Sequence, residues 1–192
     1  KFSTGFLGTK HVMLALSKYG YHDLSYKLFK QTEYPSWGYS VVNGSTSIWE
    51  RWNSYTKDAD ENSTNNTAMN SFSHYAFGSV AEWMFIHGLG IDTEDEGFRN
   101  IIIKPAISKE VGFMKGSYDG INGTIASNWE LKGKKLNLTV SIPVNTKAKI
   151  YIPTSKSSSV KEGKKAISQH PDIKVLSLNE NETVLEVGSG TY

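Results

Sequence analysis

The chain has 192 residues, enough for one large domain or two small ones. Its net charge of +2, with no Lys/Arg stripe, excludes a typical nucleic-acid-binding protein. The absence of cysteine excludes disulfides, thiolate metal sites and Cys nucleophiles. No run of roughly 18 apolar residues is present, so we expect no membrane partner. The chain starts at Lys1 without Met or a signal peptide, and we expect a piece of a longer polypeptide. Compartment and oligomeric state stay open.

The first 34 residues are predicted to form two antiparallel helices. Gly20 provides a left-handed cap for the first helix, and Pro35 ends the second. Two helices cannot bury their own apolar faces, so this αα-hairpin requires further helices to cover it.

Residues 36–56 are rich in aromatic side chains and glycine, which favours short strands or loops over a helix. Residues 57–69 are polar. Three of them mimic the opening of an EF-hand calcium loop: Asp58, Asp60 and Asn62. Ser63 replaces the glycine that this loop requires, and Met69 stands where its closing glutamate belongs. We therefore expect a solvated loop and no metal site.

Residues 70–87 are predicted to form the strongest helix, with Asn70 or Ser71 as its N-cap. The segment is apolar on nearly all sides, so the helix should be buried. His74 and Gly78 would lie one turn apart on one face. A single histidine on a buried helix is usually a satisfied core residue, so His74 needs a partner to count as a site residue.

After residue 97 the composition becomes typical of β-structure, with alternating apolar and polar residues between glycine turns. Candidate strands are 98–103, 112–118, 123–130, 135–142 and 149–152, with weaker ones near 159–161, 173–178 and 183–187. Such spacing predicts an antiparallel β-sandwich. The expected fold is a two-part α+β chain, helical over residues 1–93 and a β-sandwich over 94–192. No reactive constellation stands out in the β half.

The helical half contains one conspicuous acid. Glu50 lies between Trp49 and Trp52, with Arg51 beside it. Aromatic faces stack on sugar rings, and carboxylates supply both proton steps of glycoside hydrolysis, so this stretch suits carbohydrate chemistry. The alternative is a short strand with packed tryptophans and a solvated Glu–Arg pair. Hydrolysis needs two carboxyl groups, and we find one strong candidate, so its partner would come from other sequence.

Three blocks carry a resemblance to a known family: Tyr-Pro-Ser-Trp at 34–37, Ser-Thr-Ser-Ile-Trp-Glu-Arg-Trp at 45–52, and Met-Asn-Ser-Phe-Ser-His-Tyr-Ala-Phe-Gly-Ser-Val at 69–80. The chain resembles the C-terminal part of bacterial α-L-rhamnosidases, glycoside hydrolase family 78, along its whole length. The resemblance implies the end of an α/α-barrel catalytic domain, built of helical hairpins, over residues 1–93. It implies a C-terminal β-sandwich over residues 94–192.

The resemblance also implies roles for single residues. Glu50 matches the general base of an inverting hydrolysis of terminal α-L-rhamnosyl residues, and His74 matches a residue that hydrogen-bonds rhamnose. Trp37, Trp49 and Arg51 are expected to complete the substrate site. The general acid lies upstream in the family. The implied partners are a rhamnose-containing glycan or glycoside and the N-terminal part of the same polypeptide, with no metal or cofactor.

Two alternatives remain open at this point. The sandwich could be a non-catalytic carbohydrate-binding module. The chain could also be a purely structural segment that completes another barrel.

Overall fold

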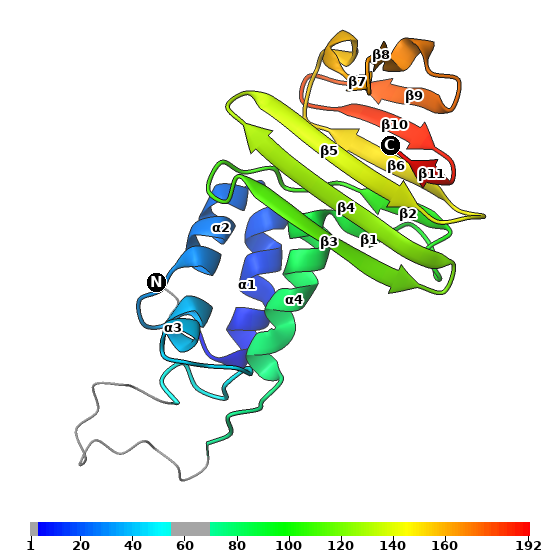
Figure 1. Ribbon diagram of the computed structural model, residues 1–192. Helices are drawn as coiled ribbons and strands as arrows, with labels where there is room; N and C mark the ends of the chain where they lie inside the picture. Colours follow the sequence, from blue (N-terminus) through cyan, green and yellow to red (C-terminus); the bar gives the residue numbers. More distant parts are fainter. Residues whose placement is uncertain (1–3, 55–69) are drawn as a thin grey trace. The chain divides into compact units, whose positions relative to one another are not determined.

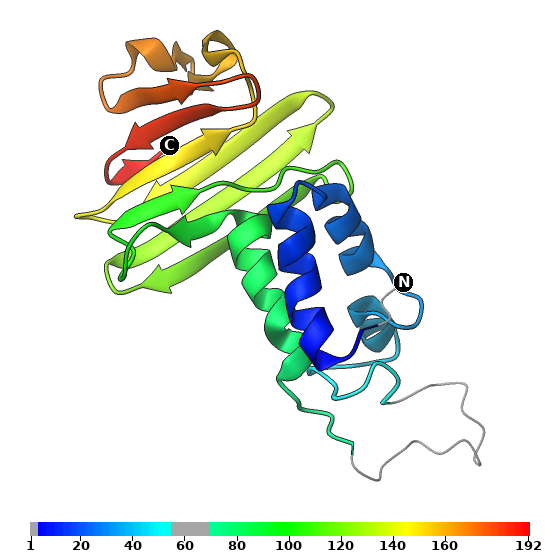
Figure 2. The same cartoon turned by 180° about the vertical axis from the view of Figure 1, so that it is seen from behind.

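The computed structural model describes residues 4–54 and 70–192, and the chain divides into two compact units, residues 1–83 and 84–192. The first unit is helical and the second is built of mostly antiparallel sheets, which confirms the predicted fold class (Figures 1 and 2). Within the described ranges, no helix is long and apolar enough to cross a membrane. The residues that mimic a calcium loop, 58–62, lie outside these ranges.

The predicted helical hairpin is confirmed as α1 (Phe6–Lys18) and α2 (His22–Lys30). Gly20, directly after the C-cap of α1, adopts φ +85°, the left-handed conformation that glycine tolerates best. The Tyr21 N–H then donates to the Leu16 carbonyl over 2.8 Å. The turn therefore closes α1 and starts α2 immediately.

The prediction of strands or loops after Pro35 is wrong at one place, where α3 (Trp37–Val42) forms a short helix. The Ser36 hydroxyl caps it by accepting the Tyr39 N–H over 2.9 Å. A Cβ on Gly38 would lie 2.3 Å from the Gln31 carbonyl oxygen, so only glycine allows this close approach. The glycine that suggested a loop is thus a packing requirement of a helix.

The predicted helix over 70–87 is also corrected, because helical structure begins only with the 3₁₀ turn η1 (Ala76–Ser79). It continues as α4 (Val80–Trp83) and the π-helix η2 (Met84–Leu89). Residues 70–75 are not helical, since their backbone groups bond to residues 48–50 instead. His74 therefore precedes the helix, and its expected spacing with Gly78 along one helical face does not occur.

A buried polar chain connects the helices of the first unit. The Trp83 indole N–H donates to the Ser17 hydroxyl over 2.8 Å, and Ser17 donates to the Ser25 hydroxyl over 3.2 Å. Trp83 also packs edge-on against Tyr26 at 5.1 Å, and burial raises the pKa of that phenol. Each buried donor in this series of hydrogen-bonded side chains needs its partner, since an unpaired buried polar group is costly.

Replacing Ser17 by Ala should therefore destabilise the first unit by about 1–3 kcal/mol, because the Trp83 N–H loses its acceptor in a dry environment. Urea unfolding followed by circular dichroism measures the change. The matched control is Ser73→Ala at an exposed serine, which should stay within about 0.5 kcal/mol of the unsubstituted protein. Equal midpoints for the two variants would contradict the role of this polar chain.

The second unit contains two main sheets and a small hairpin. In one sheet the order is β1 (Ile91–Thr93), β2 (Asn100–Ile103), β6 (Lys147–Ile152), β10 (Thr183–Val187) and β9 (Ile173–Leu178). In the other it is β11 (Gly190–Thr191), β5 (Lys135–Ile142), β4 (Gly123–Lys132) and β3 (Phe113–Gly120). The hairpin is β7 (Lys161–Glu162) with β8 (Lys165–Ala166). Among the described residues, all strand pairings are antiparallel except that of β2 with β6, which is parallel.

The two main sheets enclose one apolar core. Ile103 and Ile150 come from the first sheet, and Ile125 and Val140 from the second. Strands β4 and β6 place alternate residues in the interior, as the sequence pattern predicted. The sandwich is thus held by the mutual burial of two sheet faces.

Two side chains of strand β4 donate hydrogen bonds to the C-terminal carbonyl groups of η2. The Trp129 indole N–H, on a side chain with 0% exposure, donates to the Gly88 carbonyl over 2.8 Å. The Ser127 hydroxyl donates to the Leu89 carbonyl over 2.6 Å. The last carbonyls of a helix have no partner within it, so these two side chains satisfy groups that would otherwise be orphaned.

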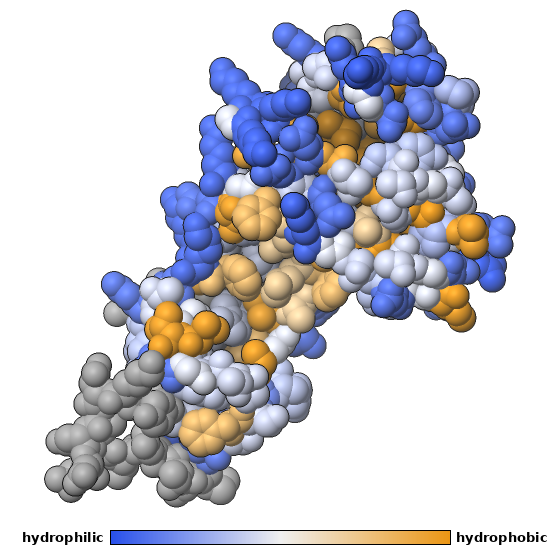
Figure 3. All heavy atoms as spheres, viewed as in Figure 1, coloured by the Kyte–Doolittle hydropathy of each residue, from blue (hydrophilic) through white to orange (hydrophobic). Residues whose placement is uncertain are grey.

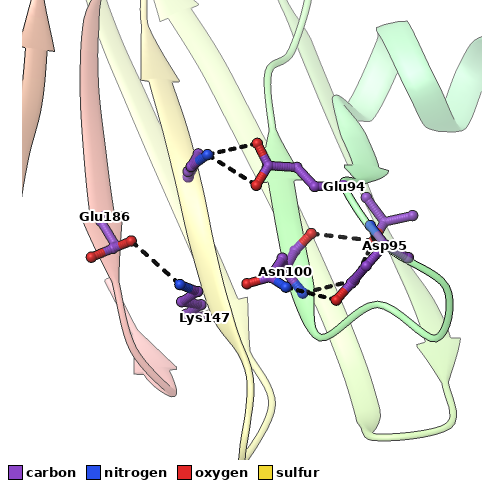
Figure 4. Close-up of polar contacts among 7 residues, drawn as sticks. Glu94, Asp95, Asn100, Lys147 and Glu186 are labelled. Carbon is purple, nitrogen blue, oxygen red and sulfur yellow. Dashed lines mark hydrogen bonds and ion pairs between the residues drawn. The ribbon is translucent and has the colours of Figure 1, made fainter.

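The polar residues around β1 and β2 form structural contacts (Figure 4). The Lys149 ammonium bonds both carboxylate oxygens of Glu94, at 2.7 and 2.9 Å. Asp95 accepts hydrogen bonds from the backbone and side-chain nitrogens of Asn100, at 3.0 and 2.6 Å. The hydrogen bond from the Asn100 backbone N–H is the main cause that lowers the pKa of the Asp95 carboxyl below its ordinary value. Every one of these carboxylates is engaged in closing the β1–β2 turn or in pairing across strands.

Candidate functional site

The two sequence blocks around Glu50 and His74 lie side by side in the first unit. The Glu50 N–H donates to the Ser71 carbonyl over 2.9 Å, and the His74 N–H donates to the Ile48 carbonyl over 2.8 Å. The Ser47 hydroxyl also donates to the Phe72 carbonyl. Segments 48–50 and 71–74 are therefore paired through their backbones, although 20 or so residues separate them in the chain.

The Glu50 carboxylate is half-buried and its two oxygens differ. Oε2 accepts the Ser71 backbone N–H over 2.6 Å, a short bond of the charge-assisted kind. For Oε1, the described part of the chain offers no hydrogen-bond donor. One oxygen thus fixes the orientation of the carboxylate, and the other can accept a proton or a hydrogen bond.

His74 is half-buried in a stack of rings. Its imidazole lies 5.0 Å from the Phe6 ring and 5.3 Å from the Tyr75 ring, nearly parallel to both. Nδ1 accepts the Ala76 N–H over 3.2 Å, which places the proton of the neutral imidazole on Nε2. Within the ranges described, Nε2 has no acceptor, so His74 presents a hydrogen-bond donor held by stacking.

The first unit contains a cavity of about 350 Å³, and several of its lining residues are sequence neighbours of Glu50. Its lining is largely aromatic and hydroxylic: Trp37, Ser40, Val41, Ser45, Thr46, Ser47, Ile48, Trp49, Trp52 and Phe77. The cavity thus brings together Trp37 and Trp49 among the expected substrate-binding residues. Glu50, Arg51 and His74 are not part of its lining. Figure 3 shows hydrophobic residues at the surface where α3 lies, in accord with the exposure of Val41.

The tryptophans of this region have different surroundings. Trp52 stacks on Phe77 at 3.8 Å, so one of its faces is covered by protein. Trp37 donates its indole N–H to the Phe77 carbonyl over 2.8 Å, and its ring meets Trp52 edge-on at 5.3 Å. Trp49 is buried and meets Phe72 edge-on at 5.8 Å. Trp52 is therefore a packing residue that shapes the cavity.

Sequence reasoning missed three polar residues that organise the site. Ser71 holds Glu50, as described above. Ser54 is buried, and its hydroxyl lies 2.7 Å from Asn70 Oδ1 and accepts the Arg51 N–H over 3.2 Å. Hydroxyl and amide residues flank the segment 55–69 on both sides, and for Ser54 and Asn70 this was the available signal. Over residues 4–54 and 70–192, no group of three or more His, Asp or Glu could hold a metal.

The geometry and the comparisons define a class of protein. Residues 1–87 match the bacterial alpha-L-rhamnosidase 6 hairpin glycosidase domain, and residues 90–167 match the bacterial alpha-L-rhamnosidase C-terminal domain. The chain is thus the end of a hairpin glycosidase domain followed by a β domain. It belongs to the bacterial α-L-rhamnosidases of glycoside hydrolase family 78, whose C-terminal region it represents.

Similar proteins cover the whole chain. An alpha-L-rhamnosidase of Streptomyces avermitilis is 36% identical over 190 residues, which are 99% of this chain and 17% of that protein. One of Formosa agariphila is 38% identical over 98% of this chain and 20% of that protein. This chain therefore spans about a fifth of the length of these relatives.

Solved structures agree. The crystal structure of the Streptomyces avermitilis alpha-L-rhamnosidase complexed with L-rhamnose matches with a TM-score of 0.84 and 36% identity, over 99% of this chain and 17% of that one. The alpha-L-rhamnosidase from Dictyoglumus thermophilum matches with a TM-score of 0.82 and 31% identity, over 100% of this chain and 20% of that one.

Proposed function

We propose that this chain supplies the general base of an inverting α-L-rhamnosidase, with Glu50 as that base. The enzyme would hydrolyse terminal α-L-rhamnosyl residues of glycosides or polysaccharides. The observation that carries the proposal is the asymmetry of the Glu50 carboxylate, with Oε2 bound to the Ser71 N–H and Oε1 unengaged among the described residues. A general base needs such an oxygen to accept a proton from water.

The reaction requires two proton transfers on opposite faces of the sugar. Glu50 Oε1 takes a proton from a water molecule as the water oxygen attacks the anomeric carbon. A second carboxylic acid protonates the departing glycosidic oxygen, and the bond to the anomeric carbon breaks. In inverting enzymes the two carboxyl groups stand about 6.5–9.5 Å apart, which leaves room for the water. The acid would come from the part of the hairpin domain that is outside this chain.

Substrate binding falls to the groups around Glu50. The His74 Nε2–H would donate to a sugar hydroxyl, because Nδ1 is already an acceptor for Ala76. Trp37 and Trp49 would hold the substrate through the aromatic walls of the cavity, and Arg51 would contribute from the position next to the base. Residues 1–93 would form the end of the barrel and residues 94–192 the C-terminal sandwich.

The proposal predicts a clear difference between the 192-residue chain and the complete enzyme, meaning this chain joined to the remainder of its hairpin domain. The complete enzyme should hydrolyse an aryl α-L-rhamnoside and release the β-anomer first, as followed by NMR. The isolated chain should show no hydrolysis, because it lacks the acid. Hydrolysis by the pure chain, or initial release of the α-anomer by the complete enzyme, would contradict the proposal.

A further inference from the structure

Two polar residues of the first unit, Ser54 and Asn70, are hydrogen-bonded to each other. The Ser54 hydroxyl lies 2.7 Å from Asn70 Oδ1, and Asn70 Nδ2 lies 3.5 Å from the Ser54 carbonyl oxygen. Ser54 is 1% exposed and Asn70 is half-buried. An asparagine amide can accept and donate at once, so this one side chain can bond both the hydroxyl and the carbonyl of Ser54.

The Ser54–Asn70 pair is connected to both partners of the hydrogen bond between the Ser71 N–H and the Glu50 carboxylate. Asn70 directly precedes Ser71, whose N–H binds Glu50 Oε2 at 2.6 Å. Ser54 accepts the N–H of Arg51, which directly follows Glu50, over 3.2 Å. Each partner of the Glu50–Ser71 bond thus has a chain neighbour that is tied to the Ser54–Asn70 pair.

We propose that Ser54 and Asn70 are positioning residues that aim Glu50 by holding Ser71 and Arg51 in register. This inference rests on the proposed role of Glu50. Without the pair, Ser71 can move relative to Glu50, and Oε2 loses the fixed donor that orients the carboxylate. Misplacement of a reacting group by about 1 Å can cost roughly 10²-fold in rate, so a small loss of register has a large effect on proton transfer.

The test is Asn70→Ala in the complete enzyme with an aryl α-L-rhamnoside. We expect kcat to fall by about 10- to 100-fold and KM to change by less than about twofold, because the aim of the base changes and the sugar contacts do not. Asn70→Asp keeps the acceptor for the Ser54 hydroxyl and should recover much of kcat. Ser54→Ala should lower kcat similarly, and the double variant should lose no more than either single variant, because the two residues act as one unit.

Asn122→Ala is the matched control. Asn122 is also half-buried and donates its amide N–H to a backbone carbonyl, that of Gly97, over 2.8 Å, but in the β unit. It should leave kcat and KM unchanged. Glu50→Gln, assayed in parallel, separates the two proposals. An inactive Glu50→Gln with a fully active Asn70→Ala overturns the positioning role alone, whereas an active Glu50→Gln overturns the base as well. If the activity lost by Asn70→Ala were explained by a higher KM or by a lower melting temperature, the role of Asn70 would be merely structural and the inference would be overturned.

Discussion

Replacing Glu50 by Gln in the complete enzyme should lower kcat on an aryl α-L-rhamnoside by about 10²–10⁴-fold, the range that general base catalysis contributes. Glutamine is nearly isosteric with glutamate, and its amide oxygen can still accept the Ser71 N–H that Oε2 binds now. The melting temperature should therefore stay unchanged. Steady-state kinetics and thermal unfolding on the same preparation measure both effects.

The matched control for this substitution is Glu82→Gln. Glu82 is an exposed carboxylate on α4 in the same unit, so removal of its charge should leave kcat unchanged. If Glu50→Gln retained near wild-type turnover, Glu50 would not be the base. If Glu82→Gln lost as much activity as Glu50→Gln, the effect would report the charge of the unit and not the site.

The largest effect on stability is expected at Trp129, which is fully buried in β4. Trp129→Ala removes the side chain from the sandwich core and the donor from the Gly88 carbonyl. Truncation of a buried Trp to Ala costs about 3–5 kcal/mol, through lost apolar burial and the cavity that remains. Urea unfolding of the complete enzyme, followed by far-UV circular dichroism, should show the transition of the β unit at a lower midpoint.

Trp129→Phe separates the two contributions. The phenyl ring keeps much of the buried apolar surface but cannot donate to Gly88, so we expect a smaller loss that includes about 1–3 kcal/mol for the unpaired carbonyl. A Trp129→Ala protein with the wild-type midpoint would show that neither contact stabilises the unit.

The strands were predicted better than the helices, because the strand pattern is local whereas the start of the last helix depends on a long-range backbone pairing. The predicted strands 135–142, 173–178 and 183–187 coincide with β5, β9 and β10. In β5 apolar residues alternate with polar ones, a pattern that directly encodes a strand with one buried face. Residues 70–75 were predicted as the start of a helix because the segment 70–87 as a whole is apolar on nearly all sides. Their backbone hydrogen bonds to residues 48–50 override that local preference, and no local pattern reveals such a long-range pairing.

The same limit applies to the site. Glu50 and His74 were selected by residue type and by family resemblance, and the structure places them on neighbouring paired segments. The structure gives a different reason to consider His74 than the sequence did. His74 precedes the helix, and its Nε2–H can donate because Nδ1 already accepts the Ala76 N–H. Ser71 could not be foreseen, because it acts through its backbone N–H, a group that every residue except proline carries.

Chemical rescue of Glu50→Ala by azide in the complete enzyme tests directly whether Glu50 is the general base. A small anion can occupy the space of the missing carboxylate and attack the anomeric carbon without a base. We expect an inactive variant whose turnover returns with azide, and a rhamnosyl azide product of inverted, β configuration identified by NMR. A variant that remains active without azide, or a product of retained α configuration, would contradict the assignment of Glu50 as the general base.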